Sequence, residues 1–151
     1  MITSLDHHQP ELSSKIYRIF QRSYAVEAAI LNCEDFPPLK RTMNAIQESS
    51  TQFYGYYDQS ELKAVMELEE AENHVHIRSL TVDPAFFRKG IGFKLLGFVK
   101  QTFTAQRITV ETGNENQPAV DFYIKFGFKK DRVWMTAFGI EKASFTLQKS
   151  P

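Results

Sequence analysis

The segment from Phe86 to Leu96 constrains the fold more than any other part of the chain. An apolar run ends just before it at Asp83-Pro84, and two close glycines are followed by apolar residues at helical spacing. This order predicts a strand, a tight loop and the first turn of a helix. Backbone N–H groups and peptide dipoles make such a turn an anion site, and the glycines let an anion approach the main chain. Three basic residues add positive charge: Arg88, Lys89 and Lys94.

Hydrophobic periodicity divides the rest of the chain into helices and strands. Helices are expected at residues 10–24, 39–49, 91–103 and 118–126, and strands at residues 2–5, 52–57, 62–68, 74–82, 108–111, 133–138 and 143–147. Residues 25–38 are expected to form an irregular acidic stretch that Pro37 and Pro38 close. Gly127 is well placed to end the last helix, and Gly139 to turn the closing hairpin.

Two features predict how these strands pair. Polar turns join the strands at 52–57, 62–68 and 74–82, which favours an antiparallel meander. Within residues 74–82 the apolar positions change from odd to even numbers, and a β-bulge would cause that change of face. The strand at 74–82, the helix after it and the strand at 108–111 follow in an order that predicts a parallel pair.

Composition limits the compartment and the partners. The 18 basic residues balance the 18 acidic ones, so general attraction to nucleic acid or to a membrane surface is not expected. Cys33 is the only cysteine, which excludes an internal disulfide and fits a reducing compartment. The first residues lack a signal-peptide pattern, and no run of about 18 apolar residues occurs. We expect one cytoplasmic domain over residues 1–151.

A second block, residues 116–128, follows the glycine loop after one helix and one strand. The loop lacks the Gly-Lys-Ser/Thr ending of a nucleotide-triphosphate loop, and the third glycine of a dinucleotide fingerprint would fall at Leu95. Together the two blocks, over residues 77–128, resemble the signature of the GNAT superfamily of N-acetyltransferases. The resemblance implies an α/β (α+β, GNAT-like) fold, with a central mixed, mostly antiparallel sheet of six to seven strands flanked by four helices.

The resemblance implies acetyl-CoA as co-substrate, and the residues themselves predict no metal site. Its pyrophosphate would lie on the amides of the glycine loop, and its pantetheine arm would run along the preceding strand like an added strand. The implied cofactor-binding residues are Leu80, Thr81, Val82, Arg88, Lys89, Gly90, Ile91, Gly92, Asn116 and Tyr123. Asn116 also suits a helix cap, and the two roles are compatible. Phe87 stands where the family commonly has Gln or Arg; because backbone amides make most anion contacts, affinity should change more than function.

The resemblance implies catalytic roles for two residues. Tyr123 would donate a proton to the departing thiolate, although a core tyrosine with a satisfied hydroxyl is the alternative. Glu111 would draw a proton from the acceptor ammonium, since only a neutral amine attacks the thioester, although a solvated strand residue explains it about as well. His76 and Arg78 are weaker candidates for the same cleft.

Two other chemistries are not indicated. His74 and His76 share a strand face, but no third ligand follows at a recognisable metal spacing. Cys33 is more simply a small buried hydrophobe than a nucleophile, and the resemblance implies direct transfer from acetyl-CoA to the amine.

The expected function is therefore N-acetyl transfer from acetyl-CoA to a primary amine by direct attack in a ternary complex. The acceptor, a small-molecule amine or a peptide amine, should contact residues 25–38, the second helix and the hairpin near Trp134. A small cationic amine is favoured by Glu27, Glu34 and Asp35 with nearby Tyr24 and Phe36, which a solvated acidic loop explains nearly as well. The alternatives are a non-catalytic acyl-CoA-binding or regulatory module of the same fold and a purely structural interaction domain. Homodimer formation stays open.

Overall fold

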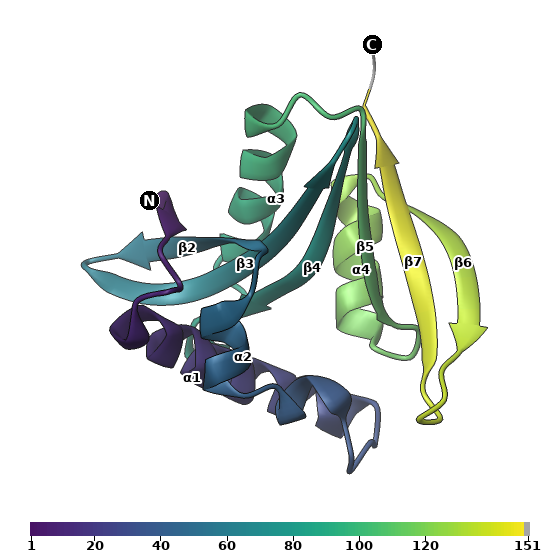
Figure 1. Ribbon diagram of the computed structural model, residues 1–151. Coiled ribbons are helices and arrows are strands. Elements are labelled where there is room, and N and C mark those ends of the chain that lie inside the picture. The colour runs from purple at the N-terminus through teal and green to yellow at the C-terminus, as the bar shows by residue number, and fades with distance from the viewer. Residues whose placement is uncertain (150–151) are drawn as a thin grey trace.

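The computed structural model describes residues 1–149, which form a seven-stranded sheet with helices on both faces (Figure 1). The order across the sheet is β1-β2-β3-β4-β5-β7-β6. The strands are β1 (Ile2–Leu5), β2 (Gln52–Asp58), β3 (Glu61–Ala71), β4 (His74–Val82), β5 (Arg107–Gly113), β6 (Lys129–Met135) and β7 (Glu141–Gln148). The helices are α1 (Pro10–Ile30), α2 (Met43–Glu48), α3 (Ile91–Thr102) and α4 (Gln117–Phe126), with short 3₁₀ helices η1 (Pro37–Lys40) and η2 (Pro84–Phe86). The predicted fold class is confirmed.

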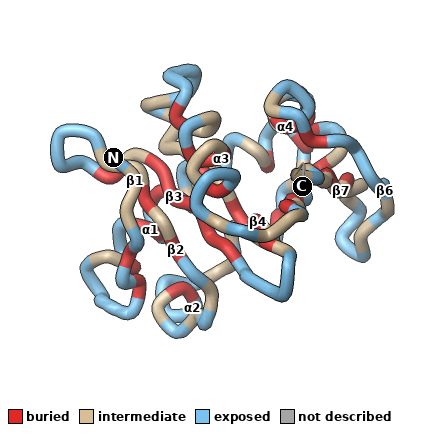
Figure 2. The backbone as a smooth tube through the Cα atoms, turned by 90° about the horizontal axis from the view of Figure 1, so that it is seen from above, coloured by how far each residue is buried: buried red, intermediate tan, exposed pale blue. Residues whose placement is uncertain are grey.

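Two apolar clusters hold the helices on opposite faces of the sheet. α3 and α4 cover one face in a cluster that includes Leu95 and Tyr123. α1 and α2 cover the other face, over β2 and β3, in a cluster that includes Phe20, Ile46 and Phe53. Figure 2 shows buried positions along the strands and the inner sides of the helices, with exposed loops around them. Burial of each large apolar side chain contributes about 1.5–3 kcal/mol, so these clusters fix the two layers against the sheet.

β4 and β5 are parallel, as predicted, but they pair over only part of their length. The paired stretch joins residues 74–77 of β4 to residues 107–110 of β5, while β4 continues against β3 as far as Val82. In Figure 1 the two strands meet at the top of the sheet and separate below. The end of β4 therefore offers backbone hydrogen-bonding groups on the side that faces away from β3.

The predicted β-bulge is present in β4. Leu68 pairs with Ile77 and Glu67 pairs with Ser79, so Arg78 is an extra residue on β4. After the bulge Leu80 packs against the same cluster as Ile77, while Ser79 is buried on the opposite face. A bulge turns side chains and ends regular pairing, and here it lies where β4 and β5 begin to separate.

α1 is longer than predicted, because residues 25–30 are helical rather than irregular. This segment contains no glycine or proline, and its Ala28 is buried with Leu31 and Phe36 in a third small cluster. The helix ends before Asn32, whose φ is 52°. The tertiary contact with Phe36 outweighs the weak helical pattern of the sequence. Although α1 has 21 residues, no helix among residues 1–149 is both long and apolar enough to span a membrane.

Two other predicted boundaries were wrong. The second helix is split into η1 and α2, because Arg41 and Thr42 are extended and the Thr42 side chain caps α2 by accepting from the N–H of Ala45 at 3.0 Å. The strand predicted at 133–138 runs instead over Lys129–Met135. β6 is an edge strand with mostly exposed side chains, so its hydrophobic pattern carries little register information. Gly139 turns the hairpin, with φ 84°.

Candidate active site

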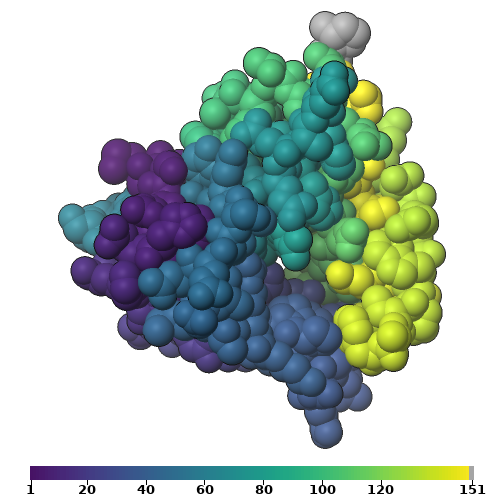
Figure 3. Space-filling view, viewed as in Figure 1, coloured from purple at the N-terminus to yellow at the C-terminus, as the bar shows by residue number. Residues whose placement is uncertain are grey.

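A cleft of about 810 Å³ opens where β4 and β5 separate. One side, the loop side, is formed by the end of β4, the loop before α3 and the inner face of α4. The opposite side, the α1 side, is formed by α1, residues 36–41 and the turn between β6 and β7 with the start of β7. The end of β5 lies between them. Figure 3 shows the hollow between the blue segment near residue 40 and the yellow-green hairpin.

On the loop side, the turn before α3 leaves backbone N–H groups free beside the cleft. Arg88 and Gly90 have positive φ values of 63° and 78°, and Gly90 is the N-cap of α3. The N–H groups of a first helical turn have no partner within the helix, so they and the helix dipole favour an anion there. A Cβ atom on Gly92 would lie 2.7 Å from Cζ of Phe122, so glycine allows α3 and α4 to approach closely.

The structure brings most of the predicted cofactor-binding residues to this cleft. Those that line it are Leu80, Val82, Arg88, Gly92, Asn116 and Tyr123. Phe87, at the position where the sequence departs from the family pattern, lines it as well and is 41% exposed. Thr81 is buried and donates a hydrogen bond to the carbonyl oxygen of Val65 at 3.1 Å. The side chain of Ile91 is in the core, and Lys89 does not line the cleft.

α4 carries Asn116 and Tyr123 into the cleft. The Oδ1 atom of Asn116 accepts a hydrogen bond from the N–H of Ala119 at 3.4 Å, which confirms the predicted helix cap. Tyr123 is 5% exposed and its ring contacts Phe128 and Phe145. Burial raises the pKa of Tyr123, and the negative charge of Glu27 adds to the rise. The phenol is therefore protonated at neutral pH and able to donate a proton.

On the α1 side, Glu27 faces the end of β5. Leu31, the C-cap residue of α1, lies one helical turn after Glu27. It is so close to Gly113, the last residue of β5, that a Cβ atom on Gly113 would lie 2.8 Å from the methyl groups of Leu31. Glu27 lines the cleft, and burial raises its pKa, while the Asn116 side chain and the positive charge of Lys142 oppose the rise. Glu27 is therefore an acidic group held in a partly dry site, where burial disfavours its charged form.

The other acidic residues predicted to surround the acceptor lie elsewhere. Glu34 and Asp35 are exposed, and neither lines the cleft. Asp35 forms an exposed ion pair with Lys40 at 2.7 Å. Trp134 stacks with Arg132 and is outside the cleft, although the same hairpin contributes other residues to it. Residues 43–48 of α2 do not line the cleft either.

Glu111, the predicted base, lines the cleft beside a lysine. Its Oε1 atom lies 3.3 Å from Nζ of Lys142, and the two side chains are 36% and 34% exposed. Arg78 also lines the cleft and donates to Glu69 at 2.6 Å. His76 lies apart from the cleft lining, with Nδ1 2.8 Å from Oγ1 of Thr109. Among the residues predicted to act as a base or to lie near it, Glu111 therefore both lines the cleft and contacts a primary amine, that of Lys142.

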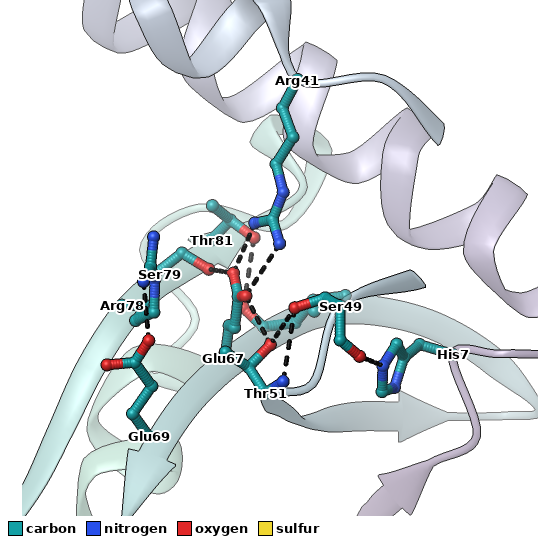
Figure 4. A network of polar contacts seen from close by, with 10 residues as sticks. His7, Arg41, Ser49, Thr51, Glu67, Glu69, Arg78, Ser79 and Thr81 are labelled. Atoms are coloured by element: carbon teal, nitrogen blue, oxygen red, sulfur yellow. Dashed lines mark hydrogen bonds and ion pairs between the residues drawn. The ribbon is translucent and has the colours of Figure 1, made fainter. Parts of the chain in front are cut away.

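A buried carboxylate in the cleft wall, Glu67, was not predicted. It is 1% exposed and receives hydrogen bonds from Nη1 and Nη2 of Arg41 at 2.6 and 2.9 Å and from Oγ1 of Thr51 at 2.6 Å. Figure 4 shows these groups converging on it, with Ser79 beyond. Burial works to raise the pKa of Glu67, but the hydrogen bonds from Arg41 and Thr51 outweigh it and the pKa is lowered. The sequence does contain one signal for a buried carboxylate here, because Glu67 is the single charged residue within the apolar strand segment 64–68.

Comparison with known proteins agrees with this architecture. The sequence matches the family described as "Acetyltransferase (GNAT) domain" over residues 25–147. A curated relative, UPF0157 protein YqkA of Bacillus subtilis (strain 168), is 33% identical over 148 residues. That match covers 97% of this chain but only 43% of the relative, so the chain spans less than half of the relative's length.

Solved structures share the fold over nearly the whole chain. The PaiA N-acetyltransferase of Thermoplasma acidophilum, in complex with coenzyme A, superposes with a TM-score of 0.78 at 18% identity, covering 99% of this chain and 98% of that one. The ribosomal-protein-S18-alanine N-acetyltransferase of Escherichia coli gives a TM-score of 0.75 at 18% identity, covering 100% and 94%. On the family match and this fold, the chain belongs to the GNAT acetyltransferase family.

Proposed function

We propose that this chain is an N-acetyltransferase that moves an acetyl group from acetyl-CoA to a primary amine by direct attack in a ternary complex. The observation that carries the proposal is the cleft at the separation of β4 and β5, which collects an anion-binding turn, a protonated phenol and carboxylates. Coenzyme A in the related PaiA structure supports the choice of donor. We assign the activity to a single domain over residues 1–151.

The donor would be held mainly by backbone groups of the loop side. Its pyrophosphate would lie on the amides of residues 88–92, where Gly90 adopts a left-handed conformation. Its pantetheine arm would run along residues 80–82, whose outer edge is free of β5. Asn116 lines the same cleft and would contact the arm while it caps α4. This arrangement would direct the thioester toward Tyr123.

The chemistry would need one group to accept a proton and one to donate a proton. Glu111 would take a proton from the acceptor ammonium, so that the amine lone pair attacks the thioester carbonyl. The C–S bond breaks, and Tyr123, which burial keeps in its protonated form by raising its pKa, would protonate the departing thiolate. Arg41 already fills the lone pairs of Glu67, which makes that carboxylate a poor base.

The acceptor would enter from the α1 side as an alkylammonium ion. Glu27 would pair with its charge, since this carboxylate lies in the cleft beside aromatic Tyr24 and Phe36. Aromatic faces and a carboxylate together suit an organic cation. Glu34 and Asp35 have no part in this version of the proposal because they do not line the cleft.

The test is thiol release from acetyl-CoA with a mixed panel of small primary amines and amino-terminal peptides. The expected result is release above the hydrolytic background with at least one small primary amine, together with its acetylated product. Binding of acetyl-CoA by calorimetry is measured in parallel. Binding without release across the panel favours a non-catalytic acyl-CoA-binding module, and absence of binding refutes both functions.

A further inference from the structure

Lys142 places a primary amine of the chain itself inside the cleft. It lies on β7 directly opposite Gly113, the last residue of β5, so the sheet register fixes its backbone at the place where β5 ends. Its Nζ atom lies 3.3 Å from Oε1 of Glu111, and its side chain is 34% exposed. The amine is therefore held by the fold yet open to a molecule in the cleft.

The amine of Lys142 has the same neighbours that are proposed for the acceptor amine. Under the proposed function, Glu111 is the group that contacts the attacking nitrogen, and the nitrogen that contacts Glu111 here is Nζ of Lys142. Its positive charge also acts on Glu27, the proposed partner of the acceptor ammonium. Both carboxylates assigned to an external amine are thus engaged by this lysine, and Tyr123 lines the same cleft.

The other lysines with hydrogen-bond partners are directed elsewhere. Lys63 donates to Asp58, Lys94 to Tyr56, Lys130 to Asn114 and Lys149 to the carbonyl oxygen of Phe103, and none of these four lysines lines the cleft. Among residues 1–149, Lys142 is the lysine that lines the cleft. Lys142 therefore differs from the other lysines by its position in the cleft, not by how far its side chain is exposed to solvent.

We infer that Lys142 is a self-acetylation site, which becomes acetylated at Nζ by acetyl-CoA bound in its own cleft. The inference rests on the proposed function. Glu111 takes one proton from the ammonium of Lys142, and the neutral nitrogen attacks the thioester carbonyl. An N–C bond forms, the C–S bond breaks, and the thiolate leaves with a proton from Tyr123; the second proton lost by the nitrogen restores the phenol of Tyr123, and Glu111 passes the first to solvent. The products are Nε-acetyl-lysine and coenzyme A, with one net proton released.

Acetylation would change the cleft that performs it. The amide nitrogen carries no charge, so the ion pair between Lys142 and Glu111 is lost. Glu27 and Glu111 then face the cleft without a neighbouring cation from β7, which favours an incoming ammonium. The modification therefore couples the state of one lysine to the affinity for the acceptor.

The experiment incubates the full chain with isotopically labelled acetyl-CoA and no added amine, and peptide mass spectrometry follows the label at each lysine. Lys142 should be labelled about 100-fold faster than Lys100, an exposed lysine of α3 that reports uncatalysed acetylation. The rate per chain should not depend on protein concentration, because the reaction is intramolecular. Two variants test the assignment: Lys142→Arg should lose this label, and Glu111→Gln should slow it about 100-fold.

Labelling of Lys142 at the rate of Lys100, while calorimetry shows acetyl-CoA bound, overturns the inference. An unchanged rate at Lys142 in Glu111→Gln overturns it too, since the label then arises without the base. The proposed function is tested by a separate measurement, which is thiol release from acetyl-CoA with the amine panel. Release to an external amine without label at Lys142 leaves that function standing and removes only the self-acetylation.

Discussion

Two glutamates that line the same cleft, Glu67 on β3 and Glu27 on α1, are held in opposite ways. Glu67 is 1% exposed, and its oxygens receive two hydrogen bonds from Arg41 and one from Thr51, so its pKa is lowered in spite of burial. Glu27 is held by α1 in the lining of the cleft, and burial raises its pKa although Asn116, Lys142 and Thr112 act to lower it. The first charge is already satisfied by the fold, whereas the second still gains by meeting a cation. Burial alone therefore does not identify a functional carboxylate; what separates the two is whether the neighbouring groups outweigh burial, as they do at Glu67 and do not at Glu27.

Removal of the Arg41 side chain should give the largest effect on stability. Arg41→Ala leaves the buried charge of Glu67 without its cation, and breaking a buried pair in this way costs about 3 kcal/mol. Arg41 also lies 5.8 Å from the ring centre of Phe20 and 5.9 Å from that of Phe53, and those contacts are lost as well. Chemical denaturation measures the free energy of unfolding.

The matched control is Arg78→Ala. Arg78 pairs with Glu69, but the two side chains are 51% and 45% exposed, so its loss should cost about 0.5 kcal/mol. Equal destabilisation by the two substitutions would show that Glu67 is not the anchor described here. The contrast tests whether burial and hydrogen bonding, rather than ion pairing as such, fix residues 36–51 on the sheet.

Tyr123→Phe tests a group of the cleft that donates rather than accepts a proton. Loss of general acid catalysis should lower turnover about 100-fold, with acetyl-CoA binding largely retained because the ring still packs against Phe128 and Phe145. Turnover under conditions where chemistry limits the rate is compared with the dissociation constant from calorimetry. Tyr54→Phe, which removes a phenol outside the cleft lining, is the control and should leave turnover within about twofold. Unchanged turnover in Tyr123→Phe removes this residue from the mechanism.

The two sides of the cleft differ in how far the sequence predicts them. On the loop side, the glycines, the change of apolar phase in β4 and the helix start at Pro118 are all local patterns, so the loop, the bulge and the position of Tyr123 were predicted. The resemblance to a known family adds the identity of the donor to this local reading.

The α1 side depends on contacts between distant segments, which local patterns do not encode. Glu27 reaches the cleft only because α1 continues to Ile30, and that extension is stabilised by contact with Phe36. Glu67 and Arg41 are 26 residues apart in the chain. A glutamate flanked by apolar strand residues indicates that a partner is needed, but nothing in the sequence says which cation supplies it. The acceptor side therefore had to be taken from the structure.

Glu27→Gln should weaken use of the acceptor while leaving the fold intact. The amide keeps the size of the side chain but removes the charge, so the Michaelis constant for the amine should rise about ten-fold. Steady-state kinetics with a reactive amine from the panel gives this value. Glu34→Gln, an exposed residue outside the cleft lining, is the matched control and should behave as the wild type. An equal rise in both variants would place the cation site away from Glu27.

The smallest effect expected is on the pH dependence of stability, and its sign separates the two carboxylates. The pKa of Glu67 is lowered below its ordinary value of 4.5, so its stabilising contribution is present above pH 4.5 and is lost as the pH falls through the folded-state pKa. The pKa of Glu27 is raised above 4.5, so its contribution is present below pH 4.5 and is lost as the pH rises through the folded-state pKa.

The measurement is the free energy of unfolding of the wild type minus that of each glutamine variant, from about pH 3 to about pH 8, where one proton gives a slope of at most about 1.4 kcal/mol per pH unit. For Glu67→Gln this difference should increase with pH on the acid side of 4.5. For Glu27→Gln the difference should decrease as the pH rises above 4.5. Slopes of the same sign would mean that both carboxylates are satisfied by the fold, and Glu27 would then have no unpaired charge to offer an acceptor.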